Sequence, residues 1–251
     1  LGLSFMTGVI LSVWGAWRRG LDPHAMLDVG ILAIVGAVIG ARLYYVLLHF
    51  ENFRGDLFSI VNPFHAGGRG VGGLVSSGGF VGGILSALLY LRLRGLSFPM
   101  YADAIAPSIA LGVFFTRIGC FLNGCCYGKA WDGVLAVSFP PNSPAGQFQM
   151  QVEATGLHPS QLYESFGGLA ILALLLTAGQ RWNRWKGFQF YMLFITYAVL
   201  RFLVDLTRHY EVGEWLGPLT HNQVICLVFF VGFGTLALRS IGLAREASPG
   251  V

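Results

Sequence analysis

Seven stretches of apolar residues follow one another along the chain and are separated by polar segments. A helix needs about 20 apolar residues to span a bilayer core, and the period-2 alternation of a barrel strand is absent. The pattern predicts an all-α integral membrane protein with seven transmembrane helices, forming a single transmembrane domain over residues 1–251. The expected spans lie at about 3–17, 25–49, 71–91, 101–123, 160–178, 188–207 and 220–238.

The composition agrees with this prediction. The chain is 55% hydrophobic and 11% charged, whereas soluble domains carry about 25% charged residues. The basic residues form no patch interleaved with aromatic side chains, so no nucleic-acid partner is expected. No small-residue cleavage site follows the apolar start, so no cleaved signal peptide is expected.

The 16 basic residues are distributed unevenly between the two ends of the predicted helices. If the spans alternate in direction, nine lie in loops on one side and four in loops on the other, and three lie inside spans. Cytoplasmic loops carry an excess of Lys and Arg, so we expect the N-terminus outside and the C-terminus in the cytoplasm. The nine are Arg18, Arg19, Arg92, Arg94, Arg181, Arg184, Lys186, Arg239 and Arg245, and the four are Arg54, Arg69, Lys129 and Arg208.

Two long loops, at about 50–70 and 124–159, both lie outside in this topology. They are rich in Gly, Pro and Asn. Long loops on a compact protein are often functional, so we expect function on the outer side.

Arg42, Arg117 and Arg201 are the three arginines inside apolar segments. An arginine at membrane depth costs at least a few kcal/mol unless it has a partner or a water-filled cavity. All three fall toward the outer ends of their spans, which predicts a site for a phosphorylated lipid headgroup. The alternative is snorkelling of a long side chain to the interface, and it fits Arg42 best.

Residues 117–128 combine an arginine, an asparagine and three glycines at the outer end of the fourth span. Arginine offers paired donors to phosphate, and Asn123 adds an amide. A helix that ends in Asn-Gly suits a loop lining a cavity. A merely polar helix C-terminus is the alternative interpretation.

Two further polar motifs enter apolar sequence. Residues 158–164 carry a histidine, a glutamine and a glutamate together. Tyr197, Arg201 and Asp205 are spaced by four and therefore share one stripe of a helix, which allows an Arg201–Asp205 ion pair. That pair could be purely structural.

The third span begins with the glycine-rich segment 72–83, which contains Ser77, Gly78 and Gly79. Glycines at this density allow close approach of a ligand or of a neighbouring helix. Composition alone does not separate these two interpretations.

Cys120, Cys125 and Cys126 have the spacing C-x4-C-C, and Cys226 is the fourth cysteine. The spacing does not match paired C-x2-C zinc units, so no metal is expected. At the outer interface disulfides are permitted. A bridge from Cys120 to one of its neighbours and three free thiols are both compatible with this spacing.

Taken together, these segments resemble the prolipoprotein diacylglyceryl transferase family of bacterial membrane enzymes. The resemblance covers about residues 25–238 and depends on the order and spacing of its pieces. They are Gly40-Ala41-Arg42, the glycine-rich start of the third span, Asp103-x-Ile105-Ala106-Pro107, Arg117 to Gly128, His158 to Glu164, and Tyr197-x3-Arg201.

The resemblance implies a seven-span protein of the bacterial cytoplasmic membrane whose site faces the outer leaflet. Its members transfer a diacylglyceryl group from phosphatidylglycerol to a cysteine thiol near the signal sequence of a lipoprotein precursor, and glycerol phosphate leaves. Membrane lipids are the other expected partners, and no metal, nucleotide or other cofactor is implied.

The chain departs from the family pattern at several positions. Ser77 stands where the family has a histidine important to activity, Cys120 where it usually has asparagine, and Cys125 where it has an acidic residue. Asp205 replaces the more usual glutamate. Fewer bases then remain to deprotonate a thiol, and Ser77 itself is a poor one. Proton removal would fall to His158, to solvent, or to a thiol ionised by the arginines.

By this resemblance, Arg117 and Arg201 stabilise the charge that develops on the leaving phosphate, while Asn123 and Tyr197 orient the headgroup. Two alternatives remain open: the same lipid donor with a different acceptor, and a non-catalytic phospholipid-binding or lipid-moving protein. The further expected substrate-binding residues are Arg42, Ser77, Gly78, Gly79, Gly128, His158, Glu164 and Asp205.

Overall fold

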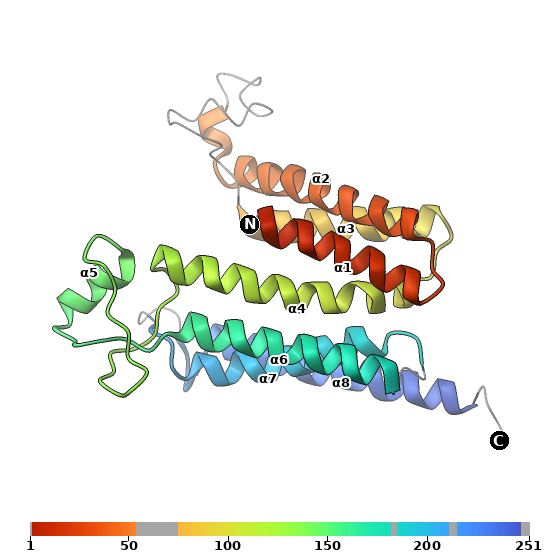
Figure 1. Cartoon of the computed structure of the whole chain (residues 1–251). Helices are drawn as coiled ribbons and strands as arrows, with labels where there is room; N and C mark the ends of the chain where they lie inside the picture. The colour runs from red at the N-terminus through yellow and green to blue at the C-terminus, as the bar shows by residue number, and fades with distance from the viewer. Residues whose placement is uncertain (1, 54–74, 182–184, 211–214, 247–251) are drawn as a thin grey trace. The chain divides into compact units, whose positions relative to one another are not determined.

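Long helices occupy all seven predicted apolar segments in the part of the chain that the structure describes (Figure 1). The computed structural model describes residues 2–53, 75–181, 185–210 and 215–246. The bounds of the seven long helices are α1 Gly2–Arg18, α2 Pro23–Leu48, α3 Ser76–Leu93, α4 Phe98–Asn123, α6 Ser160–Arg181, α7 Phe188–Asp205 and α8 His221–Glu246. These helices coincide with the predicted segments to within a few residues, except that the last helix ends later than predicted. Residues 71–74 of the third predicted segment lie outside the described residues.

Five of these helices, α2, α4, α6, α7 and α8, contain stretches long and apolar enough to cross a membrane. A shorter apolar helical stretch, Ser77–Leu93, forms most of α3, and α1 has 17 residues. Large apolar side chains such as Leu47, Phe80 and Leu122 are exposed by 73%, 74% and 80%. A bilayer would cover such surfaces, so the helical framework is that of an integral membrane protein.

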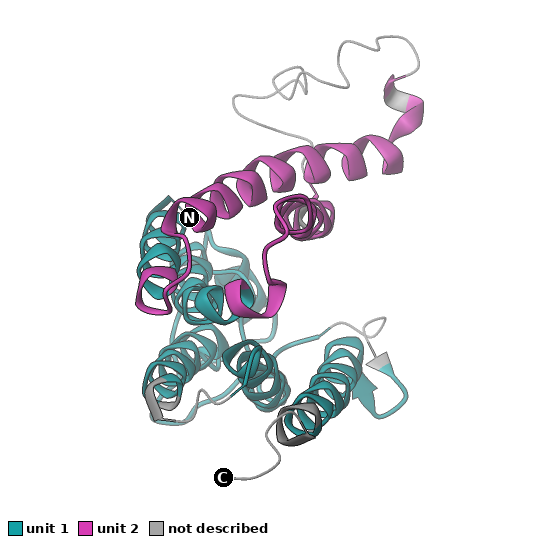
Figure 2. Ribbon diagram, turned by 90° about the vertical axis from the view of Figure 1, so that its right-hand side faces the viewer, with its two compact units in different colours: residues 1–15, 102–251 teal, residues 16–101 magenta. Residues whose placement is uncertain are grey.

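The chain divides into two compact units, residues 1–15 with 102–251 and residues 16–101 (Figure 2). The single transmembrane domain stays a prediction.

In the unit of residues 16–101, α2 and α3 pack through glycines. A Cβ atom added to Gly78 would collide with the Gly40 carbonyl oxygen and with Tyr44, and one added to Gly82 would collide with the Gly36 carbonyl oxygen. Small residues let helix backbones approach closely. The described glycines of the glycine-rich segment therefore serve helix packing, and residues 72–74 of that segment lie outside the described residues.

In the other unit, α4, α6 and α7 pack around a core of mostly small and branched side chains, and α7 also packs against α8. Gly168 of α6 allows close approach to α4, because an added Cβ atom would lie 3.1 Å from the Ala110 carbonyl oxygen. The core residues are Ala106, Ala110, Ile171, Leu175 and Leu193.

A buried aspartate fixes the start of α7. Asp103 of α4 accepts hydrogen bonds from the backbone N–H groups of Gly187 at 2.7 Å and Phe190 at 3.0 Å. The first N–H groups of a helix have no partner within it, and a carboxylate also suits the positive end of the helix dipole. Asp103 therefore joins α4 to α7 at the end opposite to Arg201.

The second predicted loop is ordered. It contains α5, Pro144–Gln151, whose N-cap Ser143 accepts from the Gly146 N–H at 3.0 Å. Isolated bridges pair Leu157 with both Ala130 and Val137, and Phe139, Ala145 and Leu157 form a small core. Of the first loop, only the short 3-10 helix η1, Phe50–Phe53, is described, and residues 54–74 lie outside the described part.

A two-stranded antiparallel hairpin precedes α8 and was not predicted from the sequence. Its strands are β1, Trp215–Leu216, and β2, Leu219–Thr220. The left-handed backbone of Gly217, with φ of 64°, falls in the two-residue turn, where glycine is favoured. The hairpin ends at Thr220 and so positions the first turn of α8.

Candidate active site

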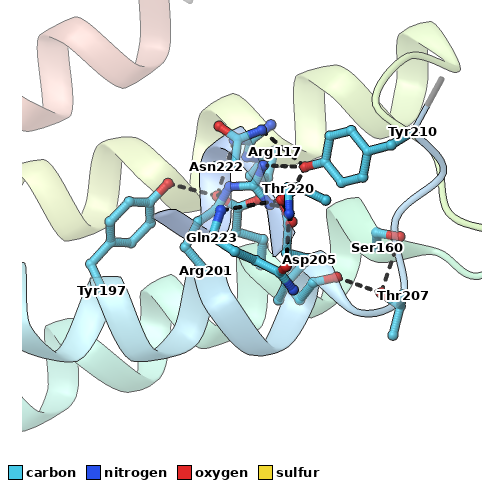
Figure 3. A network of polar contacts seen from close by, with 12 residues as sticks. Arg117, Ser160, Tyr197, Arg201, Asp205, Thr207, Tyr210, Thr220, Asn222 and Gln223 are labelled. Atoms are coloured by element: carbon cyan, nitrogen blue, oxygen red, sulfur yellow. Dashed lines mark hydrogen bonds and ion pairs between the residues drawn. The ribbon is translucent and has the colours of Figure 1, made fainter. Parts of the chain in front are cut away.

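Glu164 of α6 contacts polar side chains of two other helices, α4 and α7, and Figure 3 shows the network around Arg117, Tyr197 and Arg201. Its carboxylate oxygen Oε1 is 3.0 Å from Nη2 of Arg117 on α4 and 4.0 Å from Nε of Arg201 on α7. The Tyr197 hydroxyl donates a hydrogen bond of 2.7 Å to the same oxygen. Only 2% of the Glu164 side chain is exposed, so two arginines converge on one buried carboxylate.

Arg201 makes a second set of contacts through its two terminal nitrogens, Nη1 and Nη2. Its Nη1 lies 3.0 Å from Oδ1 of Asp205, one turn later on α7, and its Nη2 donates to the Tyr210 hydroxyl at 3.0 Å. The pair predicted from the i, i+4 spacing is therefore present. Tyr210 in turn donates to Asp205 in a short hydrogen bond, and the three groups form a closed cycle.

Burial, and then the hydrogen bond to Asp205, raise the pKa of Tyr210 above its usual value, although Arg201 opposes the shift. The phenol therefore stays protonated at neutral pH and remains a donor. This holds the Asp205 carboxylate in place beside Arg201.

The first turn of α8 completes the support of Asp205. Thr220 donates a short hydrogen bond from its hydroxyl to Asp205 and accepts one from the backbone N–H of Gln223 at 3.1 Å. The Gln223 side chain accepts from the Thr220 N–H at 3.0 Å. This reciprocal arrangement is a capping box, so the N-terminus of α8 and the Arg201 network share Thr220. Asn222 donates to the Tyr210 hydroxyl at 3.1 Å.

The end of α4 lies beside this network. Gln161, only 1% exposed, donates from its side chain to the Cys125 carbonyl oxygen at 2.8 Å. All four cysteines are free thiols, so the structure contains three free thiols at positions 120, 125 and 126 rather than a bridge. Burial alone would raise the pKa of the Cys126 thiol. The positive charges of Arg208 and Arg117 lower it by more, so this pKa lies below its usual value.

His158 lies just before α6, and within the described residues it makes no hydrogen bond or ion pair with Arg117, Glu164 or Arg201. Its ring stacks on Trp131 at 4.1 Å between centroids, and Nδ1 is 3.3 Å from the Tyr163 hydroxyl. Burial, and then Lys129, lower the pKa of His158. The ring is therefore largely neutral at pH 7 and can accept a proton.

Gly128 is packed against the segment that carries His158. Its N–H donates to the His158 carbonyl oxygen at 3.0 Å, and an added Cβ atom would collide with His158 and with Ser160. The glycine is thus required by close backbone packing, and a direct role toward substrate stays a prediction.

Asn123 is exposed at the C-terminus of α4, and no described residue hydrogen-bonds its side chain. Arg42 and the segment 77–79 belong to the other unit. There the Arg42 guanidinium lies 5.7 Å from the Tyr45 ring centroid and 5.4 Å from that of Phe53, and Ser77 is exposed near the start of α3. Substrate contacts of these residues stay predictions.

An apolar cavity of about 220 Å³ lies between α7 and α8. Two of its lining residues, Ala198 and Phe202, flank Arg201 in the sequence of α7. The full lining consists of Ala198, Val199, Phe202, Leu203, Cys226, Leu227 and Phe230.

Four residues of the network were missed from the sequence: Tyr210, Thr220, Asn222 and Gln223. A usable signal existed for two of them, because Thr220-x-x-Gln223 before an apolar run is the pattern of a capping box. Tyr210 and Asn222 carry no such signal, since only the tertiary fold brings them together.

Comparison with known proteins gives consistent matches over the chain. Residues 1–239 match the family model described as prolipoprotein diacylglyceryl transferase. A phosphatidylglycerol–prolipoprotein diacylglyceryl transferase of Acaryochloris marina is 30% identical over 99% of this chain and 87% of its own length. The proteins of the same name from Bacillus cereus and Bacillus mycoides are each 33% identical over 90% of this chain and 82% of their own.

Proposed function

Because the chain belongs to the prolipoprotein diacylglyceryl transferase family, we propose that it transfers a diacylglyceryl group from phosphatidylglycerol to the cysteine thiol of a lipoprotein precursor. Glycerol phosphate is the leaving product. The observation that supports this most directly is the convergence of Arg117 and Arg201 on Glu164.

Glu164 orients both guanidinium groups and leaves donors for a ligand. A guanidinium has five N–H donors in a planar fork that fits phosphate. The Arg117 side chain is 19% exposed, so part of it is accessible. Nη1 of Arg201 makes an ion pair with Asp205 but no hydrogen bond of good geometry within the described part. The N–H groups of Nη1 can therefore still donate to an incoming phosphate oxygen.

The reaction is an alkyl transfer to sulfur. The acceptor thiolate attacks the glyceryl carbon bonded to the phosphate oxygen, the C–O bond breaks, and the electron pair stays on the phosphate. The arginines stabilise the charge that develops there. In this proposal Tyr197 and Asn123 orient the headgroup, Asp205 and Glu164 hold the arginines, and Arg42, Ser77, Gly78, Gly79, Gly128 and His158 contribute to substrate binding.

The apolar cavity between α7 and α8 fits one acyl chain of the donor. Its lining is aliphatic and aromatic, and its residues adjoin Arg201 in α7. A lipid whose phosphate meets Arg201 would place its hydrocarbon along this cavity, where van der Waals packing would hold the chain.

The membrane arrangement is part of the proposal. Seven spans are inferred from the seven apolar segments, and the outer N-terminus from the bias of basic residues in the loops. The family resemblance adds the bacterial cytoplasmic membrane and a site at its outer leaflet. The acceptor is then a precursor peptide whose cysteine follows its signal sequence.

The test is expression of the full chain in bacterial cells depleted of their own transferase. The expected result is precursor carrying a diacylglyceryl thioether, detected by mass spectrometry, and restored growth. Binding of phosphatidylglycerol without any thioether would instead support the non-catalytic alternative, and a lipid-modified product other than the precursor would support a different acceptor.

A further inference from the structure

The three cysteines near the end of α4 form one cluster. The Sγ atoms of Cys120, Cys125 and Cys126 all lie within 4.8 Å of one another. The three side chains are free thiols and partly exposed. The spacing C-x4-C-C left open whether Cys120 approaches its neighbours, because the grouping depends on how the helix ends.

A Schellman turn brings the thiols together. The Cys125 N–H donates to the Cys120 carbonyl oxygen at 3.1 Å, and the Gly124 N–H donates to that of Phe121 at 3.1 Å. Gly124 is left-handed, with φ of 67°, as this motif requires. The turn folds Cys125 back over Cys120, and the buried Gln161 holds the Cys125 carbonyl oxygen from α6.

Cys126 continues the turn in a left-handed conformation, with φ of 60°. A non-glycine residue with such a φ is uncommon, and its strain persists only where the surroundings fix it. Here the strained conformation presents the third thiol to the first two.

We propose that Cys120, Cys125 and Cys126 bind one thiophilic cation of the Zn²⁺ class, and that its open fourth position takes the acceptor thiol. The second half of this proposal depends on the proposed function. Thiolates prefer soft and borderline cations. Three protein ligands with a fourth position left open are characteristic of catalytic zinc, whereas structural zinc has four protein ligands. No fourth His, Cys, Asp or Glu of the described residues joins the cluster.

The geometry suits a bridging cation better than a disulfide. Two thiolates bound tetrahedrally at about 2.3 Å from zinc lie about 3.8 Å apart, so thiols already within 4.8 Å of each other need to move little. A disulfide requires an S–S distance of about 2.05 Å and would use only two of the three sulfurs.

The charges around the three cysteines also suit a cluster of thiolates with one bound cation. Three thiolates and one divalent cation leave a net charge of −1, and both Arg208 and Arg117 interact electrostatically with Cys126.

A cation here would supply a means of deprotonating the acceptor thiol, which the polar network around Glu164 does not provide. Glu164 and Asp205 are both engaged by arginines and hydroxyl groups, so neither is a free base. A thiol that coordinates Zn²⁺ is deprotonated. The acceptor thiol would release its proton to solvent on binding, its sulfur would form the new bond to the glyceryl carbon, and the C–O bond to the phosphate would break.

The test uses the purified full chain in detergent, stripped of metal under reducing conditions and titrated with Co²⁺ as a spectroscopic probe for Zn²⁺. We expect one equivalent to bind, with the absorption of thiolate ligation. This binding should be lost in Cys120→Ser, Cys125→Ser and Cys126→Ser and retained in Cys226→Ser, which removes the cysteine outside the cluster. Absence of stoichiometric binding, or binding that survives the three substitutions, would overturn the site.

The fourth position is tested by adding a precursor peptide. A peptide with its cysteine should change the Co²⁺ spectrum, and the same peptide with serine should not. No change with the cysteine peptide would overturn the open position. Transfer by the metal-free chain is then measured with and without Zn²⁺: we expect activity only after reloading. Full activity without metal would overturn this inference and leave the proposed function intact, whereas failure of the proposed function would appear as metal binding without transfer under either condition.

Discussion

The carboxylate of Glu164 lies 3.0 Å from the guanidinium of Arg117, with 2% of the glutamate side chain and 19% of the arginine side chain exposed. The two residues belong to different helices, α6 and α4. Through the same oxygen Glu164 also receives the Tyr197 hydroxyl of α7. One carboxylate therefore joins three helices and fixes the arginine that we assign to phosphate binding.

Glu164→Gln should destabilise the protein as well as inactivate it. The amide cannot offset the charge of Arg117, and removing one partner of a buried ion pair costs about 3–5 kcal/mol. The measurement is the midpoint of thermal unfolding in detergent, together with the transfer rate. Glu153→Gln is the control, because Glu153 is exposed in the loop after α5. Equal stability of the two variants would contradict the central position of Glu164.

Arg201→Lys should not preserve activity. Arg201 uses different nitrogens toward Glu164, Asp205 and Tyr210, and a lysine ammonium lacks that planar fork. We expect a loss of transfer of about 100-fold or more, on the scale of removing one preorganised donor. A lysine variant that transfers at a rate within a few-fold of the original would show that charge alone suffices.

Filling the apolar cavity, or groove, between α7 and α8 should impair the use of long-chain phosphatidylglycerol as donor. Val199 lines the groove, and Val199→Trp would place an indole where we propose an acyl chain. The matched control is Val228→Trp on α8, a position that is 63% exposed and outside the groove lining. We expect a raised KM for long-chain phosphatidylglycerol in the first variant only. Unchanged kinetics in both would remove the acyl chain from this groove.

The helices could be predicted from the sequence because their signals are local. Apolar runs of about 20 residues determine where α2, α4 and α7 lie, whatever surrounds them. The Arg201–Asp205 ion pair could be predicted for the same reason, since a spacing of four on one helix places both side chains together.

The arrangement of the site could not be predicted, because it depends on contacts between helices. The sequence placed Glu164 among several substrate-binding residues, but its role in joining Arg117, Tyr197 and Arg201 appears only when α4, α6 and α7 are packed together. Likewise, the C-x4-C-C spacing left open whether Cys120 approaches its neighbours and indicated no metal site, because the left-handed turn at Gly124 determines where the last two thiols lie.

The topology is tested with single cysteines in a chain whose four native cysteines are alanine. Asn142→Cys lies in an exposed part of the second loop, and Arg94→Cys is exposed after α3. The bias of basic residues predicts that the first position is outside and the second cytoplasmic. An impermeant thiol reagent added to spheroplasts should label only Asn142→Cys. Labelling of only Arg94→Cys would invert the topology.

The central claim is that Arg117 and Arg201 bind the phosphate that leaves during transfer, and Arg117→Gln tests it most directly. The measurement is the initial rate of diacylglyceryl transfer from labelled phosphatidylglycerol to a precursor peptide, per amount of folded, membrane-inserted protein, with Arg94→Gln as an exposed-arginine control. We predict a loss of about 100-fold or more for Arg117→Gln and an unchanged rate for the control. A rate for Arg117→Gln within a few-fold of the original would contradict the account and place the headgroup elsewhere.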